Sequence, residues 1–151
     1  MSEKKYYYFA YGSNMHEKRF FERCPKAKFV GTGILWNYKL AERKYTDIDY
    51  SVDDLVEGVV YQITESDLMK LDVCEGYPHI YRRYWVEIEV GEKTIHAVVY
   101  EMTPTTKEMR HGIPFPDWYY NICKIGAKQH GIEFNIEQTD DRWFFRRWGR
   151  R

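Results

Sequence analysis

The sequence predicts an α+β fold, with a mixed or largely antiparallel sheet curled into a small barrel and helices flanking it. At least five segments have the composition of strands, and most of them follow one another without a helix between them. Further segments carry the capping residues of helices. The chain has 151 residues, 44% of them hydrophobic, which is enough for one globular core. We therefore expect a single domain over residues 1–151, with an Arg/Trp-rich tail at 142–151.

The N-terminal third is expected to be mainly strand. Residues 6–11 form a continuous aromatic run typical of a strand covered on both faces. Residues 16–23 suit one or two helical turns, because Pro25 disfavours helix in the residue before it. Residues 28–45 have strand composition interrupted by two glycines, which predicts a bulged or bent strand pair. The acidic stretch 46–54 is expected to be a surface loop.

The middle of the chain predicts a strand, a helix and a hairpin. Residues 56–63 form the strand, and Thr64 followed by Asp67 resembles a helix N-cap. That helix should stop at Gly76. Next, the segments YWVEIEV and KTIHAVVYEM flank a Gly-Glu corner at 91–92, and the alternation of apolar and acidic residues before this corner indicates a half-exposed hairpin strand.

The C-terminal part predicts a loop and a last helix. Residues 104–116 contain three prolines and a glycine, so no regular structure is expected there. Asp117 is expected to cap a helix that ends at Gly131. The face expected to pack on the sheet consists of the residues near helical spacing, Trp118, Ile122, Ile125 and Gln129.

Charge and composition weigh against several classes of protein. The 23 basic and 23 acidic residues cancel, so nothing steers the whole molecule toward nucleic acid or an anionic membrane. No apolar stretch is long enough for a signal peptide or a membrane span, so we expect a cytoplasmic protein. The histidines show no ligand spacing, so no metal site is expected. The cysteines have no CxxC pair and indicate reduced thiols, and we expect Cys74 to be buried as a small apolar residue.

Two short motifs are candidates for chemistry. A turn that carries Gly12 directly after a buried strand can expose successive backbone N–H groups, which suit a carboxylate or a developing oxyanion; an ordinary tight turn is the alternative. Glu75 lies where a helix ends among aromatic residues. Loss of solvation there would raise the pKa of the Glu75 carboxyl group, which would let it act as a proton shuttle near neutral pH. The alternative is a surface glutamate that forms an ion pair with Arg82 or Arg83.

Four segments of the sequence, in the same order as in the family, resemble motifs of the γ-glutamylcyclotransferase-like family. This family includes γ-glutamylcyclotransferases, γ-glutamylamine cyclotransferases and the plant AIG2-like proteins. The family's YGSN loop is matched by Tyr11, Gly12, Ser13 and Asn14, and its E-G-Y-P-x-x-Y-x-R setting by Glu75, Gly76, Tyr77, Pro78, Tyr81 and Arg83. Tyr100 lies in a strand, AVVYEM, that resembles the family's tyrosine-bearing strand, and Tyr119 lies near the start of a helix that resembles its late helix. The resemblance covers about residues 5 to 135.

The resemblance implies an enzyme that cleaves a γ-glutamyl amide. The α-amine of the substrate attacks its own γ-carbonyl, which releases 5-oxoproline and an amine or amino acid. Glu75 is expected to be the general acid/base, and the loop from Tyr11 to Asn14 is expected to bind the substrate. Tyr81, Tyr100 and Tyr119 are the other expected substrate-binding residues. A small γ-glutamyl compound is then the partner, no cofactor is required, and a homodimer is left open.

Two alternatives to this enzyme follow from the residues. The same pocket could bind a small metabolite without turnover. The tail RWFFRRWGRR, residues 142–151, interleaves arginines with large rings and suits an adaptor that binds an anionic partner. We favour a tail that folds back over an apolar seam, because an exposed strip of large rings would promote aggregation.

Overall fold

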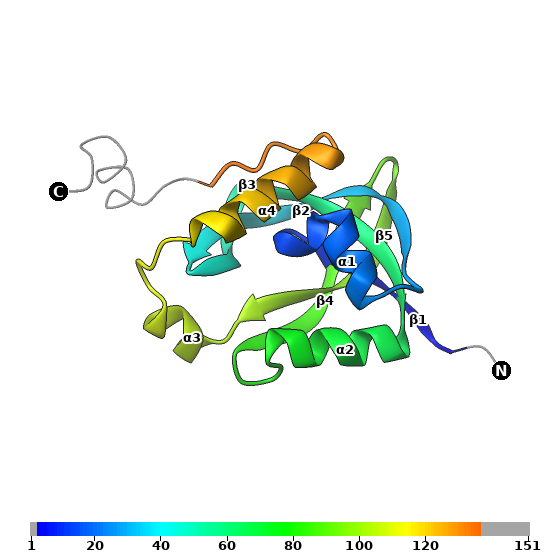
Figure 1. Ribbon diagram of the computed structural model, residues 1–151. Helices are drawn as coiled ribbons and strands as arrows, with labels where there is room; N and C mark the ends of the chain where they lie inside the picture. Colours follow the sequence, from blue (N-terminus) through cyan, green and yellow to red (C-terminus); the bar gives the residue numbers. More distant parts are fainter. Residues whose placement is uncertain (1–2, 137–151) are drawn as a thin grey trace.

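Five strands close into a barrel in the computed structural model, which describes residues 3–136 (Figure 1). Their order around the barrel is β1-β3-β2-β4-β5. The strands are β1 Lys5–Ala10, β2 Lys28–Arg43, β3 Tyr45–Thr64, β4 Tyr81–Val90 and β5 Lys93–Met102. Neighbouring strands run antiparallel except β1 and β5, which pair in parallel and close the barrel. The predicted α+β barrel is therefore confirmed.

Helices pack around the outside of the barrel (Figure 1). They are the 3₁₀ turn η1 Ser13–Met15, α1 Glu17–Arg23, α2 Glu65–Glu75, α3 Pro104–Met109 and α4 Asp117–Gln129. Within residues 3–136, no helix combines the length and the apolar character that crossing a membrane requires. The Arg/Trp-rich tail predicted at 142–151 lies outside the described residues.

The predicted surface loop at 46–54 is wrong, because these residues belong to β3. β2 is one long strand with a register shift between Phe29 and Gly31, and its second half pairs with the start of β3 rather than within itself. Two of the acidic residues that suggested a loop, Asp47 and Asp49, are paired with cations: the fully buried Asp47 carboxylate lies 2.8 Å from Arg43 Nη1 and 3.2 Å from Lys107 Nζ. Paired in this way, acidic side chains are compatible with a buried strand.

The same carboxylate cluster ties three elements together. Asp47 also accepts a hydrogen bond of 2.8 Å from the backbone N–H of Met102 on β5. Lys107 on α3 bridges to Asp49 at 2.6 Å and to Glu101 at 2.8 Å. The tip of the β2–β3 hairpin is thereby fixed against β5 and α3, and removal of one partner from a buried ion pair typically costs about 3–5 kcal/mol.

Three predictions for the C-terminal part are wrong in detail. Residues 104–109 form α3, because Thr103 accepts a hydrogen bond from the N–H of Thr106 and proline is tolerated in the first turn of a helix. In α4, Asp117 is the first helical residue rather than the cap. The buried face is Tyr119, Cys123, Gly126 and Ala127, whereas Trp118 and Ile125 of the predicted face are exposed. The prediction relied on large apolar residues, whereas the closest contact of the helix is made at Gly126.

Other expected boundaries are confirmed. α2 begins at a capping box in which Thr64 and Asp67 exchange side-chain and backbone hydrogen bonds of 3.1 Å each. The helix ends at Gly76, which is left-handed with φ 67°. α4 likewise ends before a left-handed glycine, Gly131. The hairpin of β4 and β5 turns at Gly91 as predicted.

Alternating side chains of the strands build two apolar cores. One fills the barrel and includes Phe9, Leu35, Ile48, Val60 and Ile88. The other lies between the barrel and the helices, where the ring of Tyr61 stacks on that of Phe20 with centroids 4.0 Å apart. β1 contributes Tyr8 to the outer core and Phe9 to the inner one, as expected for a strand covered on both faces.

Gly126 brings α4 into direct contact with the backbone of η1. A Cβ at this position would lie 2.4 Å from the backbone nitrogen of His16 and 2.7 Å from the carbonyl carbon of Met15. A glycine is therefore required here for packing, although it weakens a helix interior by about 1 kcal/mol relative to alanine. The contact fixes the turn that follows β1.

We predict that Gly126→Ala destabilises the protein by about 1–3 kcal/mol, because the added methyl forces α4 away from η1. Helix propensity alone would make the alanine variant more stable, so a lower free energy of unfolding identifies the steric clash. Urea denaturation measures it. Gly31→Ala is the control, because the nearest atom to a Cβ there is 3.4 Å away. Equal stability changes in the two variants would contradict the prediction.

Candidate functional site

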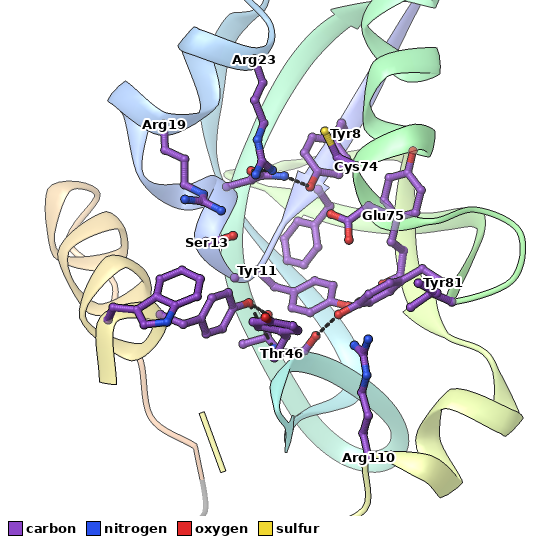
Figure 2. Close-up of a pocket in the computed structure, with 18 residues that line it drawn as sticks. Tyr8, Tyr11, Ser13, Arg19, Arg23, Thr46, Cys74, Glu75, Tyr81 and Arg110 are labelled. Carbon is purple, nitrogen blue, oxygen red and sulfur yellow. Dashed lines mark hydrogen bonds between the residues drawn. The ribbon is translucent and has the colours of Figure 1, made fainter. Parts of the chain in front are cut away.

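A cavity of about 280 Å³ opens between the end of β1, the C-terminal end of α2, the tip of the β2–β3 hairpin and the start of α4 (Figure 2). Its wall contains every residue predicted for the site, namely Tyr11, Gly12, Ser13, Asn14, Glu75, Tyr81, Tyr100 and Tyr119. The fold therefore brings the YGSN turn and the glutamate motif to one cavity. The catalytic and binding roles of these residues remain predictions.

The turn at one end of the cavity is compressed between two elements. A Cβ on Gly12 would lie 2.1 Å from Thr46 Oγ1 and 3.1 Å from the Tyr119 hydroxyl, so only glycine fits there. η1 follows at once, with the N–H of Met15 donating to the carbonyl of Gly12. The first N–H groups of such a turn have no partner within the turn itself, which is what the anion-binding prediction requires.

Asn14 is a buried structural link within this turn. Its side chain donates to the Tyr8 hydroxyl at 3.0 Å and accepts from Arg23 Nη1 at 3.2 Å. Its carbonyl accepts from the Tyr61 hydroxyl at 2.9 Å. The side-chain contacts of Asn14 therefore hold Arg23 and Tyr8 in place, and a substrate contact would have to be made in addition to them.

Glu75 is the last residue of α2, and Gly76 turns the chain away immediately after it. Figure 2 shows its carboxyl group facing the cavity interior, with Ser13, Arg19 and Arg23 on the side of η1 and α1. Burial raises the pKa of this carboxyl group from 4.5 to about 7, and the guanidinium groups of Arg23 and Arg19 counteract only part of that rise. A group with this pKa exchanges protons readily near neutral pH.

The alternative of a surface ion pair for Glu75 is wrong. Arg83 pairs with Asp72, with Nε 2.8 Å from Oδ1, and Arg82 pairs with Glu101 at 3.3 Å. The expectation that Cys74 is buried is also wrong: its side chain is exposed and lines the cavity, whereas Cys24 and Cys123 are buried. Both predictions concern adjacent residues at the end of α2. The orientation of the helix decides which of the two side chains points into the protein, and the sequence alone did not show it.

The hydroxyl groups of the predicted tyrosines all have protein partners. Tyr11 donates to the carbonyl of Tyr100, and Tyr100 donates to Asp72 Oδ1 at 2.7 Å. Tyr81 donates to the carbonyl of Thr46 at 2.9 Å, and the Tyr119 hydroxyl accepts from the N–H of Thr46 at 3.1 Å. Burial raises the pKa of each phenol, so these rings stay neutral. They form a rigid wall whose oxygens can still accept a hydrogen bond.

Sequence reasoning missed three arginines of the wall, Arg19, Arg23 and Arg110. Arg19 and Arg23 are spaced i, i+4 on α1, which places them on one helix face and was a usable signal. Arg110 follows α3, in the segment for which no structure was expected, and nothing in the sequence pattern indicated its position. Thr46 was missed because its strand was taken for a loop.

Comparisons with known proteins agree with this geometry. The family model described as "Gamma-glutamyl cyclotransferase, AIG2-like" matches residues 8–120. A gamma-glutamylcyclotransferase from Homo sapiens is 31% identical, covering 90% of this chain and 77% of the relative. One from Bos taurus is 29% identical, covering 89% and 77%. A solved structure called gamma-glutamyl cyclotransferase is similar with a TM-score of 0.73 at 29% identity, covering 91% of this chain and 90% of that chain.

We predict that Glu75→Gln makes the protein more stable than wild type above pH 7. The folded-state pKa is about 7 and the ordinary value is 4.5, so wild type loses stability as pH rises between these values, whereas the glutamine variant does not. A shift of this size corresponds to about 3 kcal/mol.

Urea denaturation at pH 4.5 and pH 8 measures this difference. The stability gap between variant and wild type should be larger at pH 8. Glu22→Gln, at an exposed position on α1, is the control and should show no such gap. A gap for Glu75→Gln that does not change with pH would contradict the predicted proton affinity.

Proposed function

The chain belongs to the gamma-glutamyl cyclotransferase, AIG2-like family, and from this premise we propose that it cleaves a γ-glutamyl amide through attack of the substrate's own α-amine on its γ-carbonyl. The products are 5-oxoproline and the released amine or amino acid. The observation that carries the proposal is the half-buried Glu75 carboxyl group, whose pKa is raised to about 7 and which shares one cavity with the YGSN turn. The residue roles that follow are part of this proposal.

Glu75 moves the proton in this reaction. Its carboxylate takes a proton from the α-ammonium, and the neutral amine then forms a bond to the γ-carbon. The attacking nitrogen of the tetrahedral intermediate still carries two protons. Glu75 gives its proton to the leaving nitrogen as the bond between that nitrogen and the γ-carbon breaks and the carbonyl re-forms. The regenerated carboxylate then takes the second proton from the ring nitrogen and passes it to the released amine, which departs as an ammonium. Charge and atoms balance without water or an enzyme nucleophile. The raised pKa suits both directions of transfer, because neither form of the carboxyl group is strongly preferred near pH 7.

The positive wall of the cavity orients the glutamyl part. Arg19 and Arg23 lie close enough to Glu75 to lower its proton affinity, so their charges reach the reacting centre. We assign to them, together with the turn at Gly12–Asn14, the binding of the α-carboxylate. Once this end is fixed, the short chain of the substrate must curl toward Glu75. Holding the two reacting groups in contact supplies much of the rate enhancement expected for a cyclisation.

The phenol wall completes the site. The hydroxyls of Tyr11, Tyr81 and Tyr100 donate to protein acceptors, so toward the substrate they act as acceptors and suit its α-ammonium or the N–H of its amide. Because their protons are already used, they do not compete with Glu75 as acids. A small γ-glutamyl compound is the partner that this wall fits, and the cytoplasmic location and the homodimer stay predictions.

We predict that Glu75→Gln lowers kcat for 5-oxoproline release by at least about 100-fold, because an amide cannot accept the ammonium proton. A panel of γ-glutamyl amino acids and γ-glutamyl amines, assayed for 5-oxoproline, provides the measurement. Glu22→Gln, with an exposed side chain, should retain wild-type rates. Release that survives in Glu75→Gln would remove Glu75 from the proton transfer. A panel on which wild-type protein releases nothing would instead favour a binding module without turnover.

We predict that kcat/KM rises with pH and reaches half its upper plateau near pH 7. Below this pH the carboxyl group is protonated in the free enzyme and cannot act as a base. The initial rate at low substrate concentration between pH 5 and 8.5 gives the profile. A profile that is flat over this range, or that falls as pH rises through 7, would be inconsistent with a carboxylate base of this proton affinity.

A further inference from the structure

The cavity wall has more positive charge than the glutamyl part of a substrate requires. Its lining residues include three arginines, Arg19, Arg23 and Arg110, against one carboxylate, Glu75. Arg19 and Arg23 come from α1, on the side of the YGSN turn. Arg110 comes from the segment after α3 and reaches the cavity from a different direction, beside Tyr81 (Figure 2). The positive charge is thus divided between two separate places.

Arg110 is held by the fold in this position. It is the C-cap of α3, and its backbone N–H donates to the carbonyl of Thr106 at 2.9 Å. α3 itself is fixed by Lys107, which is bonded to carboxylates on β3 and β5. The guanidinium carbon lies 5.5 Å from the ring centroid of Tyr45, a cation–π distance.

Among the described residues, 3–136, the guanidinium group of Arg110 has no anionic partner. Its Nη1 atom is shielded from solvent and has no hydrogen-bond partner among residues 3–136. Arg43, Arg82 and Arg83 differ in this respect, because each of them pairs with a carboxylate. A buried donor without an acceptor is costly, typically by about 1–3 kcal/mol, so an acceptor supplied by a ligand would stabilise the complex.

We propose that Arg110 determines specificity by binding a carboxylate on the leaving group of the substrate. This inference rests on the proposed function and names the class of substrate: γ-glutamyl amino acids, whose leaving group keeps a carboxylate, rather than γ-glutamyl amines. Arg19, Arg23 and the YGSN turn hold the carboxylate of the glutamyl part, and Arg110 holds the second one. Planar guanidinium groups match carboxylates with two parallel hydrogen bonds, which gives direction as well as charge.

The size and the polarity of the cavity agree with this class. A volume of about 280 Å³ lies just below the usual range of about 300–1,000 Å³ for small-molecule sites and suits a molecule the size of a dipeptide. Glu75 lies between the two groups of arginines, so a substrate anchored at both ends would present its amide to the carboxyl group (Figure 2). A neutral or cationic amine would leave Arg110 without a partner.

Two substrates isolate the contribution of the second carboxylate. γ-Glutamylalanine and γ-glutamylethylamide are identical except that the ethylamide lacks the carboxylate of the leaving group. We predict that Arg110→Gln lowers kcat/KM for γ-glutamylalanine by about 10- to 100-fold, mainly through KM, and changes that for the ethylamide by less than about twofold. Arg110→Lys keeps the charge without the planar fork and should restore part of the loss.

Lys44→Gln is the matched control. Lys44 carries the same charge near the Tyr45 ring, at 5.7 Å from its centroid, but it is exposed at the hairpin tip and does not line the cavity. Lys44→Gln should leave kcat/KM unchanged for both substrates. Equal losses on both substrates in Arg110→Gln would assign Arg110 a structural role. A wild-type enzyme with no preference for γ-glutamylalanine would overturn the inference.

Failure of the proposed function gives a different result. Wild-type protein would then release no 5-oxoproline from any γ-glutamyl compound. Calorimetric titration of Glu75→Gln with γ-glutamylalanine and γ-glutamylethylamide tests Arg110 without turnover. Tighter binding of γ-glutamylalanine, lost when Arg110→Gln is added, supports the second carboxylate site. Equal affinity for the two compounds overturns it.

Discussion

The burial of the Asp47 carboxylate at the tip of the β2–β3 hairpin is the constraint on which the site depends. Arg43, Lys107 and the N–H of Met102 satisfy this carboxylate, and they come from β2, α3 and β5. The neighbouring Thr46 accepts a hydrogen bond at its carbonyl from Tyr81 on β4 and donates its N–H to the hydroxyl of Tyr119 on α4. The buried Asp47 carboxylate therefore fixes the position of one wall of the cavity and of α3, the helix that Arg110 follows.

Glu75 is paired less completely than Asp47. Burial raises the pKa of both carboxyl groups. At Asp47 the ion pairs with Arg43 and Lys107 and the N–H of Met102 oppose that rise, whereas at Glu75 only the more distant charges of Arg23 and Arg19 do so and the pKa reaches about 7. The two carboxyl groups illustrate how a fold can use one acid for structure and leave another reactive, depending on how completely each is paired.

The turns, helix starts and helix ends could be predicted because they rest on local signals, whereas the site residues were predicted from the resemblance of short motifs to a known family. Gly12 and Gly76 mark turns, and Thr64 with Asp67 marks a helix start. The predictions that failed concern residues whose partners are distant in sequence. Asp47 suggested a solvated loop because nothing nearby in the sequence shows that Lys107 approaches it. Arg110 was missed for the same reason, and the buried face of α4 was mistaken because Gly126 packs on backbone rather than on apolar side chains.

The separation of α3 from the barrel has an evolutionary consequence. The segment from Pro104 to Met109 lies outside the strands and is joined to them by short connections and the contacts of Lys107. The residues to which we assign proton transfer and substrate binding on α2 and the YGSN turn lie outside it. Insertions or substitutions in this segment that spare Lys107 could therefore diversify the range of compounds accepted while the chemical step is inherited unchanged, which makes α3 the natural place to engineer a new selectivity.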